Sequence, residues 1–156
     1  MQPAILDLMQ EKLASAGEAS VSHRTLVLSV APEASFATAR RLKGEFGCDL
    51  CLDITAVDWL GRTPRFEVVY HFYSTQHKVR VRMKTRVSEA EPVVDSLMPL
   101  YGSAGFMERE CHDMYGIVFR GHPDLRPILL YEGFEGHPLR KDYPKTREQP
   151  LVTYRK

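Results

Sequence analysis

Residues 65–86 read RFEVVYHFYSTQHKVRVRMKTR, two β-rich runs separated by the short Ser74-Thr75-Gln76 connection. We expect strands at 65–74 and 77–86 that pair as an antiparallel hairpin. In the second run Val79, Val81 and Met83 alternate with Arg80, Arg82 and Lys84. This alternation requires one buried and one solvated face, so the hairpin predicts a sheet with helices packed on one side.

Flanking patterns supply the other elements of this layer arrangement. Amphipathic spacing predicts helices at 3–15, 32–46 and 104–115, the last two ended by Gly47 and Gly116, and a further helical segment from Pro92 through Val93, Val94, Leu97 and Met98. In the helix at 104–115 the expected apolar stripe is Met107, Cys111, Met114 and Val118. Strands are expected at 25–31, with Val21 as a short hairpin partner, and at 50–56. This order predicts an α+β fold, a two-layer sandwich of helices on a mostly antiparallel sheet.

Composition excludes several functional classes. The 156 residues suit one domain with an appendage, and a net charge of +1 argues against a nucleic-acid-binding protein. The opening residues MQPAILDLMQEKL lack the pattern of a signal peptide, so we expect the chain to stay inside the cell. No apolar run approaches the roughly 18 to 20 residues that span a bilayer, so a membrane location would come through a partner. Three cysteines without a secretory signal suggest reduced thiols.

The last 37 residues, 120–156, differ from the rest of the chain. They hold five of the ten prolines and show no sustained period, yet they carry seven large apolar residues, Leu125, Ile128, Leu129, Leu130, Tyr131, Phe134 and Leu139. Ordering such a segment costs roughly 40 to 55 kcal/mol, which burial of roughly 1,500 to 2,000 Å² of apolar surface would offset. We therefore expect an α+β domain at 1–119 and an extended partner-binding arm at 120–156.

Three cysteines and a histidine raise the possibility of metal or thiol chemistry. Cys48 and Cys51 form a CxxC that Cys111 and His112 could complete as a zinc site. In an extended strand, however, Cys48 would share a face with Leu50, Leu52 and Ile54, and Cys51 would share the other face with Asp49 and Asp53. Structural thiols are therefore the favoured interpretation. A free-standing thiol or zinc enzyme stays as an alternative.

A charged cluster, Glu108, Arg109, Glu110, His112 and Asp113, crowds one and a half helical turns. Carboxylates beside a histidine can perform acid/base chemistry, whereas residues four apart can also form intrahelical pairs on a solvated face. No HExxH, GxGxxG or P-loop motif accompanies the cluster. Composition alone therefore favours the solvated helix face.

Longer motifs surround this cluster. Residues 108–117 combine Glu-Arg-Glu with Asp-Met-Tyr-Gly-Ile, and GHPDLR at 121–126 and GHPLRKDYP at 136–144 follow. With Asp58-Trp59 and the run at 65–71, these motifs resemble the C subunit, or 30 kDa subunit family, of proton-translocating NADH:quinone oxidoreductase, respiratory complex I. The resemblance covers about residues 25–146. It departs at 131–134, where many relatives have a proline, acidic residues and tryptophan, and at Phe106, where tryptophan is common.

The resemblance implies a non-catalytic structural subunit of the peripheral arm. Such a protein supports assembly of the electron-transfer arm that passes electrons from NADH to quinone, coupled to proton translocation. It implies no catalytic, cofactor-binding or metal-binding residue in this chain, with FMN and iron-sulfur clusters on partner subunits. The implied interface and arm-anchoring residues are Glu108, Arg109, Glu110, Asp113, Gly116, His122, Arg126, His137, Arg140 and Asp142.

The same resemblance implies partners and a location. The partners would be other complex I subunits, especially the quinone-site D subunit and the cluster-bearing subunits, on the cytoplasmic face of the bacterial inner membrane. The arginines at 109, 126 and 140 would supply planar donors for carboxylates. An equivalent subunit of a related membrane-bound hydrogenase, or of a quinone oxidoreductase fed by another donor, is the nearest alternative.

Overall fold

A five-stranded sheet in the strand order β1-β2-β5-β4-β3 forms the centre of the computed structural model, which describes residues 2–149. Within this sheet of the described residues, β2 and β5 pair in parallel, and the other three neighbouring pairs are antiparallel. The prediction of a mostly antiparallel sheet is therefore confirmed. The strands are β1 (Gly17–Ser22), β2 (Thr25–Val30), β3 (Leu50–Asp58), β4 (Phe66–Ser74) and β5 (Val79–Val87).

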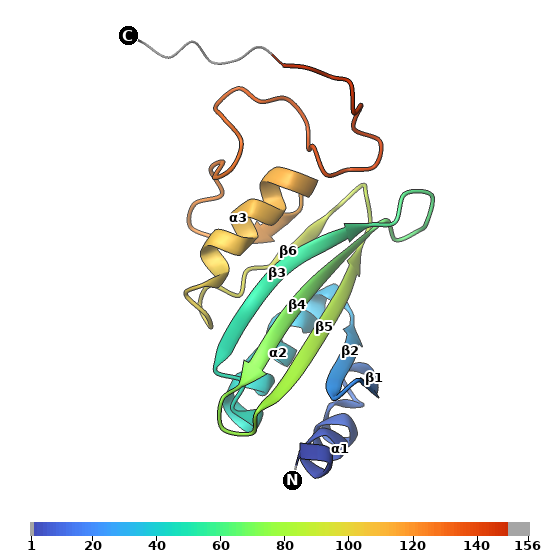
Figure 1. Ribbon diagram of the computed structural model, residues 1–156, viewed down its shortest axis with the longest axis vertical. Coiled ribbons are helices and arrows are strands. Elements are labelled where there is room, and N and C mark those ends of the chain that lie inside the picture. Colours follow the sequence, from blue (N-terminus) through green and yellow to red (C-terminus); the bar gives the residue numbers. More distant parts are fainter. Residues whose placement is uncertain (1, 150–156) are drawn as a thin grey trace.

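Three helices form the second layer. They are α1 (Gln2–Leu13), α2 (Ser35–Phe46) and α3 (Ala104–Tyr115), and the short 3-10 turn η1 (Pro32–Ala34) precedes α2. In Figure 1 α2 lies behind β4 and β5, α1 lies beside β1 and β2, and α3 lies beside β3. Their apolar sides and one face of the sheet share a single buried core, so the predicted two-layer α+β sandwich is confirmed.

The hairpin of β4 and β5 has the predicted faces. Tyr70 pairs with Met83, and Phe72 pairs with Val81, and all four side chains are fully buried. Arg80 and the other basic residues of β5 point to the opposite, open face, as the period of two requires. In this hairpin the face that packs against the helices therefore belongs to every second residue.

The segment after Pro92 differs from its prediction. Residues Val93–Asp95 form the strand β6, which pairs in parallel with a second short strand, β7 (Val118–Arg120). The two β-branched valines suit this pairing, and their partner lies 25 residues further on, out of reach of a local pattern. The expected helix is therefore wrong. Val118 is 38% exposed in β7, so it does not belong to the apolar stripe of α3.

A register shift in β3 changes the predicted faces of the cysteine region. Cys51 pairs with Phe72 and Asp53 pairs with His71, so Leu52 is the extra residue of a bulge. Cys51 and Ile54 consequently both face the core. Leu50 and Leu52 are 44% and 46% exposed, so the predicted common face of Cys48, Leu50, Leu52 and Ile54 is wrong.

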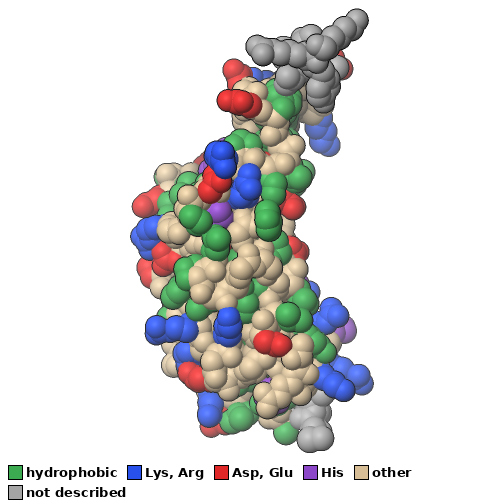
Figure 2. Space-filling view, turned by 90° about the vertical axis from the view of Figure 1, so that its left-hand side faces the viewer, with side chains coloured by type: hydrophobic (Ala, Val, Ile, Leu, Met, Phe, Trp, Pro, Cys, Tyr) green, Lys and Arg blue, Asp and Glu red, His purple; other side chains and the backbone are tan. Residues whose placement is uncertain are grey.

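After β7, residues 121–149, the C-terminal segment, contain no helix or strand within the described chain. The segment crosses the end of α3 and the end of the sheet where β3 meets β4, and then leaves the body (Figure 1). Figure 2 shows it as a narrower extension above the globular part. The boundary proposed between residues 119 and 120 stays a prediction, and residues 150–156 of the predicted arm lie outside the described part.

Candidate functional site

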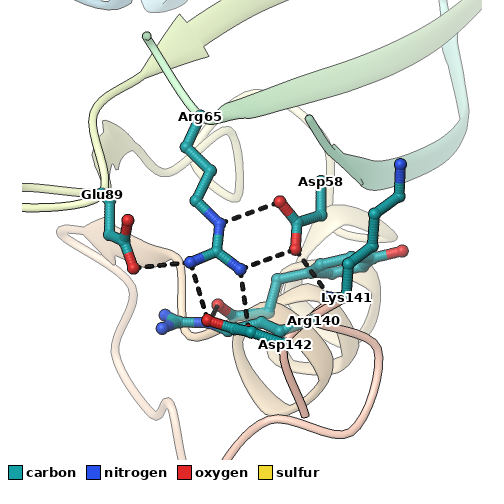
Figure 3. Close-up of polar contacts among 7 residues, drawn as sticks. Asp58, Arg65, Glu89, Arg140, Lys141 and Asp142 are labelled. Atoms are coloured by element: carbon teal, nitrogen blue, oxygen red, sulfur yellow. Dashed lines mark hydrogen bonds and ion pairs between the residues drawn. The ribbon is translucent and has the colours of Figure 1, made fainter. Parts of the chain in front are cut away.

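The C-terminal segment is fixed to the sheet by a cluster of charged residues, the anchor cluster, which comprises Asp58, Arg65, Glu89, Lys141 and Asp142 (Figure 3). Arg65, only 4% exposed, donates to both oxygens of Asp58 at 2.9 and 2.8 Å and to both oxygens of Asp142 at 3.0 and 2.8 Å. A fifth bond from Nη1 reaches Glu89 at 2.5 Å. All five N–H donors of the guanidinium are thereby used.

Asp58 connects the sheet directly to the C-terminal segment. Besides Arg65, its Oδ2 accepts a hydrogen bond from the backbone N–H of Lys141 at 2.8 Å. The hydrogen bonds from Arg65 lower the pKa values of Asp58 and Asp142, so both carboxyls are ionised at neutral pH. Arg65 and Arg140 each lie 5.0 Å from the ring centroid of Phe66, which is fully buried. Cationic and apolar contacts therefore coincide at this end of the sheet.

The same segment completes the C-terminal end of α3. The carbonyl of Asp113 accepts from Nδ1 of His137 at 2.9 Å, that of Met114 from the N–H of Leu139 at 3.2 Å, and that of Tyr115 from Nε of Arg140 at 2.7 Å. A helix leaves its last carbonyls without intrahelical partners, and the positive charge of Arg140 also suits this end of the helix dipole. Residues 137–140 thus act as an external cap of α3.

Gly116 makes this capping possible. It has a left-handed backbone with φ of 76°, and its N–H bonds to the carbonyl of His112 at 2.7 Å. A Cβ at this position would collide with the ring of His137 and lie 2.6 Å from Nη2 of Arg140. Both the turn and the close approach of the C-terminal segment therefore require glycine.

Asp113 and Arg109 hold an earlier part of the C-terminal segment. The Asp113 side chain is 3% exposed, and its Oδ2 accepts from the backbone N–H groups of residues 128, 129 and 130 at 2.8, 2.9 and 3.3 Å. Arg109 donates to the carbonyls of Arg126 and Pro127 at 2.9 and 2.8 Å. One face of α3 therefore binds the backbone of residues 126–130, independently of their side chains.

His122 fixes the start of the C-terminal segment. Its Nε2 donates to the carbonyl of Gly105 at 3.0 Å, and its Nδ1 accepts from the N–H of Asp124 at 3.0 Å. Asp124 forms a two-fold ion pair with Arg126 at 2.8 Å for each bond, which lowers the pKa of Asp124 to about 2. This exposed pair shapes the loop, and it leaves Arg126 at the surface.

Glu108 and Asp113 are buried, so the interpretation of the charged cluster as a solvated helix face is wrong for these two residues. Glu108 is fully buried and accepts hydrogen bonds from Ser96 Oγ and from the N–H of Leu97, both at 2.6 Å. Burial raises its pKa, although both bonds oppose that shift. Its partners are loop groups ahead of α3, so it stabilises that loop. Glu110 is exposed on the same helix.

The three cysteines are buried as free thiols. Burial raises the pKa of Cys48 and of Cys51 to about 12, and it raises the pKa of Cys111 as well. A thiol in this state is a poor nucleophile, because the thiolate is the reactive form. Within residues 2–149 no three His, Cys, Asp or Glu side chains are grouped closely enough to hold a metal ion.

Of the predicted site residues, the structure brings Asp113, Gly116, His137, Arg140 and Asp142 together around the end of α3 and the anchor cluster. Arg109, His122 and Arg126 lie along the segment that leads there, whereas Glu108 binds the loop at 96–97 and Glu110 is exposed. The prediction omitted four members of the anchor cluster, Asp58, Arg65, Glu89 and Lys141. An aspartate at the end of a buried strand was the available signal for the first of these.

Several large apolar side chains remain exposed on α3 and the C-terminal segment. Phe106 is 66% exposed, Leu129 is 61% exposed and Leu139 is 52% exposed. Figure 2 shows the apolar groups of this side of the molecule interspersed with charged ones. No helix within the described residues is long and apolar enough to cross a membrane.

A family model described as respiratory-chain NADH dehydrogenase, 30 Kd subunit, matches residues 28–149. The chain is 40% identical over 141 residues to the C subunit of NADH-quinone oxidoreductase from Geotalea uraniireducens, with coverage of 90% of this chain and 86% of that protein. It is 47% identical over 129 residues to the mitochondrial NADH dehydrogenase [ubiquinone] iron-sulfur protein 3 of Candida albicans. That match covers 81% of this chain and 46% of the relative, so the chain spans about half of the yeast protein's length.

Two solved structures share the fold. A trypsin-resistant fragment of Nqo5 superimposes with a TM-score of 0.67 at 29% identity, covering 80% of this chain and all of the fragment. A chain of the membrane-bound sulfane sulfur reductase, described as an archaeal respiratory membrane complex, gives a TM-score of 0.80 at 28% identity. That match covers 92% of this chain and 86% of the other.

Proposed function

The chain belongs to the 30 kDa subunit family of respiratory-chain NADH dehydrogenase, and on this premise we propose that it is a structural subunit of the peripheral arm of NADH:quinone oxidoreductase. In this role it supports assembly of the arm that passes electrons from NADH to quinone, coupled to proton translocation. The match to a bacterial C subunit over 86% of that protein's length supports this assignment.

One structural observation carries the proposal. Hydrogen bonds attach the C-terminal segment to its own domain, and these bonds join mainly backbone and charged groups. The large side chains of Leu129 and Leu139, like Phe106 of α3, point outward and remain more than half exposed. Large apolar side chains that stay exposed on a backbone attached to its domain are typical of a surface that a permanent protein partner covers.

The chemistry of the described residues supports a non-catalytic role. Each polar side chain that α3 buries has a structural partner in the surrounding loops, and burial keeps the three thiols protonated. We therefore propose that the chain holds no active site, and that the FMN and iron-sulfur clusters belong to other subunits.

The proposed partners are the quinone-site D subunit and the cluster-bearing subunits of the same arm. The proposed location is the cytoplasmic face of the bacterial inner membrane, which the chain would reach through the complex. An arm that packs against several neighbours would need surfaces on both α3 and the C-terminal segment, and both present exposed apolar groups.

Affinity capture of the tagged full chain from gently solubilised native membranes tests this proposal. We expect flavin-, cluster- and quinone-site subunits in the eluate, together with NADH:quinone activity. A Leu129→Asp/Leu139→Asp variant should lose these partners, whereas Leu60→Asp, at a comparably exposed leucine in the loop between β3 and β4, should keep them. A chain that elutes alone and keeps its native fold would refute the proposal.

A second candidate is the equivalent subunit of a related complex with a different electron donor. It is favoured by the TM-score of 0.80 to a chain of the sulfane sulfur reductase complex, although the 28% identity is lower than the 40% to the bacterial relative. The same capture experiment decides between the two. NADH-binding subunits in the eluate support complex I, and another type of catalytic protein in their place supports the related complex.

A further inference from the structure

The face of the sheet opposite the helices carries a local excess of positive charge. In β5, Lys84 and Arg86 both pair with Glu67 at 3.2 Å. Arg80 and Arg82 lie on the same face, and within the described residues neither has an acidic side chain within 4.0 Å. Unbalanced charge therefore gathers toward the end of the sheet where β5 begins.

At that end the open face is hollowed. The hollow has a volume of about 720 Å³ and is lined by Arg24, Lys78 and Arg80 together with Leu50, Leu52 and Tyr73. No acidic side chain is among the described residues that line it. The bulge in β3 leaves Leu52 46% exposed here, next to Leu50 at 44%. Apolar and cationic groups are therefore presented together in one concave surface.

Backbone geometry marks the same place. Within residues 2–149 the non-glycine residues with positive φ are His23, Arg24 and Lys78, at 48°, 60° and 55°, and all three line this hollow. Residues other than glycine seldom adopt this conformation, although asparagine, aspartate and histidine do so more often than the rest. The two-residue turn at 23–24 is of the kind that favours Asn-Gly, yet Arg24 occupies its second position. Lys78 is the last residue of the four-residue connection between β4 and β5. Backbone strain of this kind gathers where side chains serve a binding role.

We propose that this hollow binds an acidic segment of a neighbouring protein, one that carries carboxylates beside an aliphatic side chain. Arginines at 24 and 80 would receive the carboxylates, for which a guanidinium offers paired donors, and Leu50 and Leu52 would pack against the aliphatic group. This inference rests on the proposed function, since the neighbour would be another member of the complex. It adds an interface on the open face, at the end of the sheet away from the C-terminal segment.

A protein segment fits the hollow better than other anions do. A bilayer would need a convex apolar surface that can insert, whereas this surface is concave and its leucines are only half exposed. Nucleic acid would need an extended basic stripe, and the charge of the whole chain is only +1. Amphipathic peptide segments combine both required groups within a few residues.

Site-specific photo-crosslinking in the native complex tests the proposal. The full chain, with p-benzoylphenylalanine in place of Leu52, is captured from membranes after irradiation, and the adduct is mapped by mass spectrometry. We expect an adduct to one segment of another subunit that has aspartate or glutamate within a few residues. Arg24→Glu combined with Arg80→Glu should reduce its yield at least tenfold. Lys12→Glu combined with Arg40→Glu makes the same charge change on exposed helical positions and should leave the yield unchanged.

The outcomes separate this inference from the proposed function. If the captured chain brings no other subunits even without the crosslinker, the proposed function fails. If partners are captured normally but Leu52 gives no adduct, the inference fails alone. An adduct to lipid, to nucleic acid or to a segment without carboxylates overturns the inference. A yield that survives the double charge reversal, with the variant folded by circular dichroism, overturns it as well.

Discussion

Replacing Arg65 with methionine removes the centre of the anchor cluster while it keeps most of the side chain's apolar volume. Asp58 would then stay buried, with its side chain 1% exposed and only the N–H of Lys141 as a partner. Removing one member of a buried ion pair costs roughly 3 to 5 kcal/mol. The partners Glu89 and Asp142 are 56% and 49% exposed, so each adds only about 0 to 1 kcal/mol. We therefore expect the free energy of unfolding to fall by roughly 3 to 7 kcal/mol, most of it from the unpaired charge of Asp58.

Urea denaturation of the full chain measures this loss. The fluorescence of Trp59, next to the cluster, reports the local transition, and circular dichroism reports the global one. Arg86→Met is the matched control, because this arginine pairs with Glu67 at 3.2 Å but is 49% exposed. The free energy of unfolding of Arg86→Met should fall by only about 0 to 1 kcal/mol.

A second substitution tests the physical cause. If the loss comes from the unpaired charge of Asp58, adding Asp58→Leu to Arg65→Met should recover roughly 1 to 3 kcal/mol, since no charge then stays buried. A loss for Arg65→Met no larger than for Arg86→Met would refute the reasoning. A double variant less stable than Arg65→Met alone would show that packing, rather than charge, governs this site.

Three further predictions concern other positions. Gly116→Ala should destabilise the chain by at least about 1 to 2 kcal/mol in urea denaturation, because φ is 76° there and the new Cβ would also collide with His137. Gly44→Ala, in open space within α2, should instead stabilise the chain by about 0.5 to 1 kcal/mol. Hydrogen bonds from Arg65 lower the pKa of Asp142, so the stabilisation by this pair is fully present above about pH 4. The stabilisation is lost as the pH falls through the lowered pKa and the carboxylate is protonated. Limited proteolysis should therefore cut the C-terminal segment faster in acid. Tyr70→Phe should leave thermal stability unchanged or raise it by about 1 kcal/mol, because the buried hydroxyl has no partner among the described residues.

The sequence patterns correctly predicted the features that depend only on neighbouring residues. The alternation in β5 required one buried face whatever lay around it, and Gly116 follows the last turn of α3 because the chain must turn there in the left-handed conformation. The strand β6 escaped prediction because its partner β7 is distant in the chain. Without knowledge of the partner strand, Val93 and Val94 are equally compatible with a helix.

The candidate site was predictable only through resemblance to a family. Residues such as Asp113 and His137 could be named from their motifs, but their contacts depend on loops that return from far away in the chain. Arg65 and Asp142, 77 positions apart, have no local pattern that links them. The sequence of the charged cluster did not indicate that Glu108 is buried. The groups that bind Glu108 lie in the loop at 96–97, outside the helix.

The capping of α3 by residues 137–140 also makes the end of this helix depend on completed synthesis. A translation product that stops before His137 would contain the whole sheet and all three helices. The last carbonyls of α3 would then lack their capping partners, and Arg65 would keep Asp58 and Glu89 but lose Asp142. Such a product would fray at this end of α3, where loosened backbone is open to proteases. A finished chain and a truncated one would therefore differ in their resistance to proteolysis, although both contain every helix and strand.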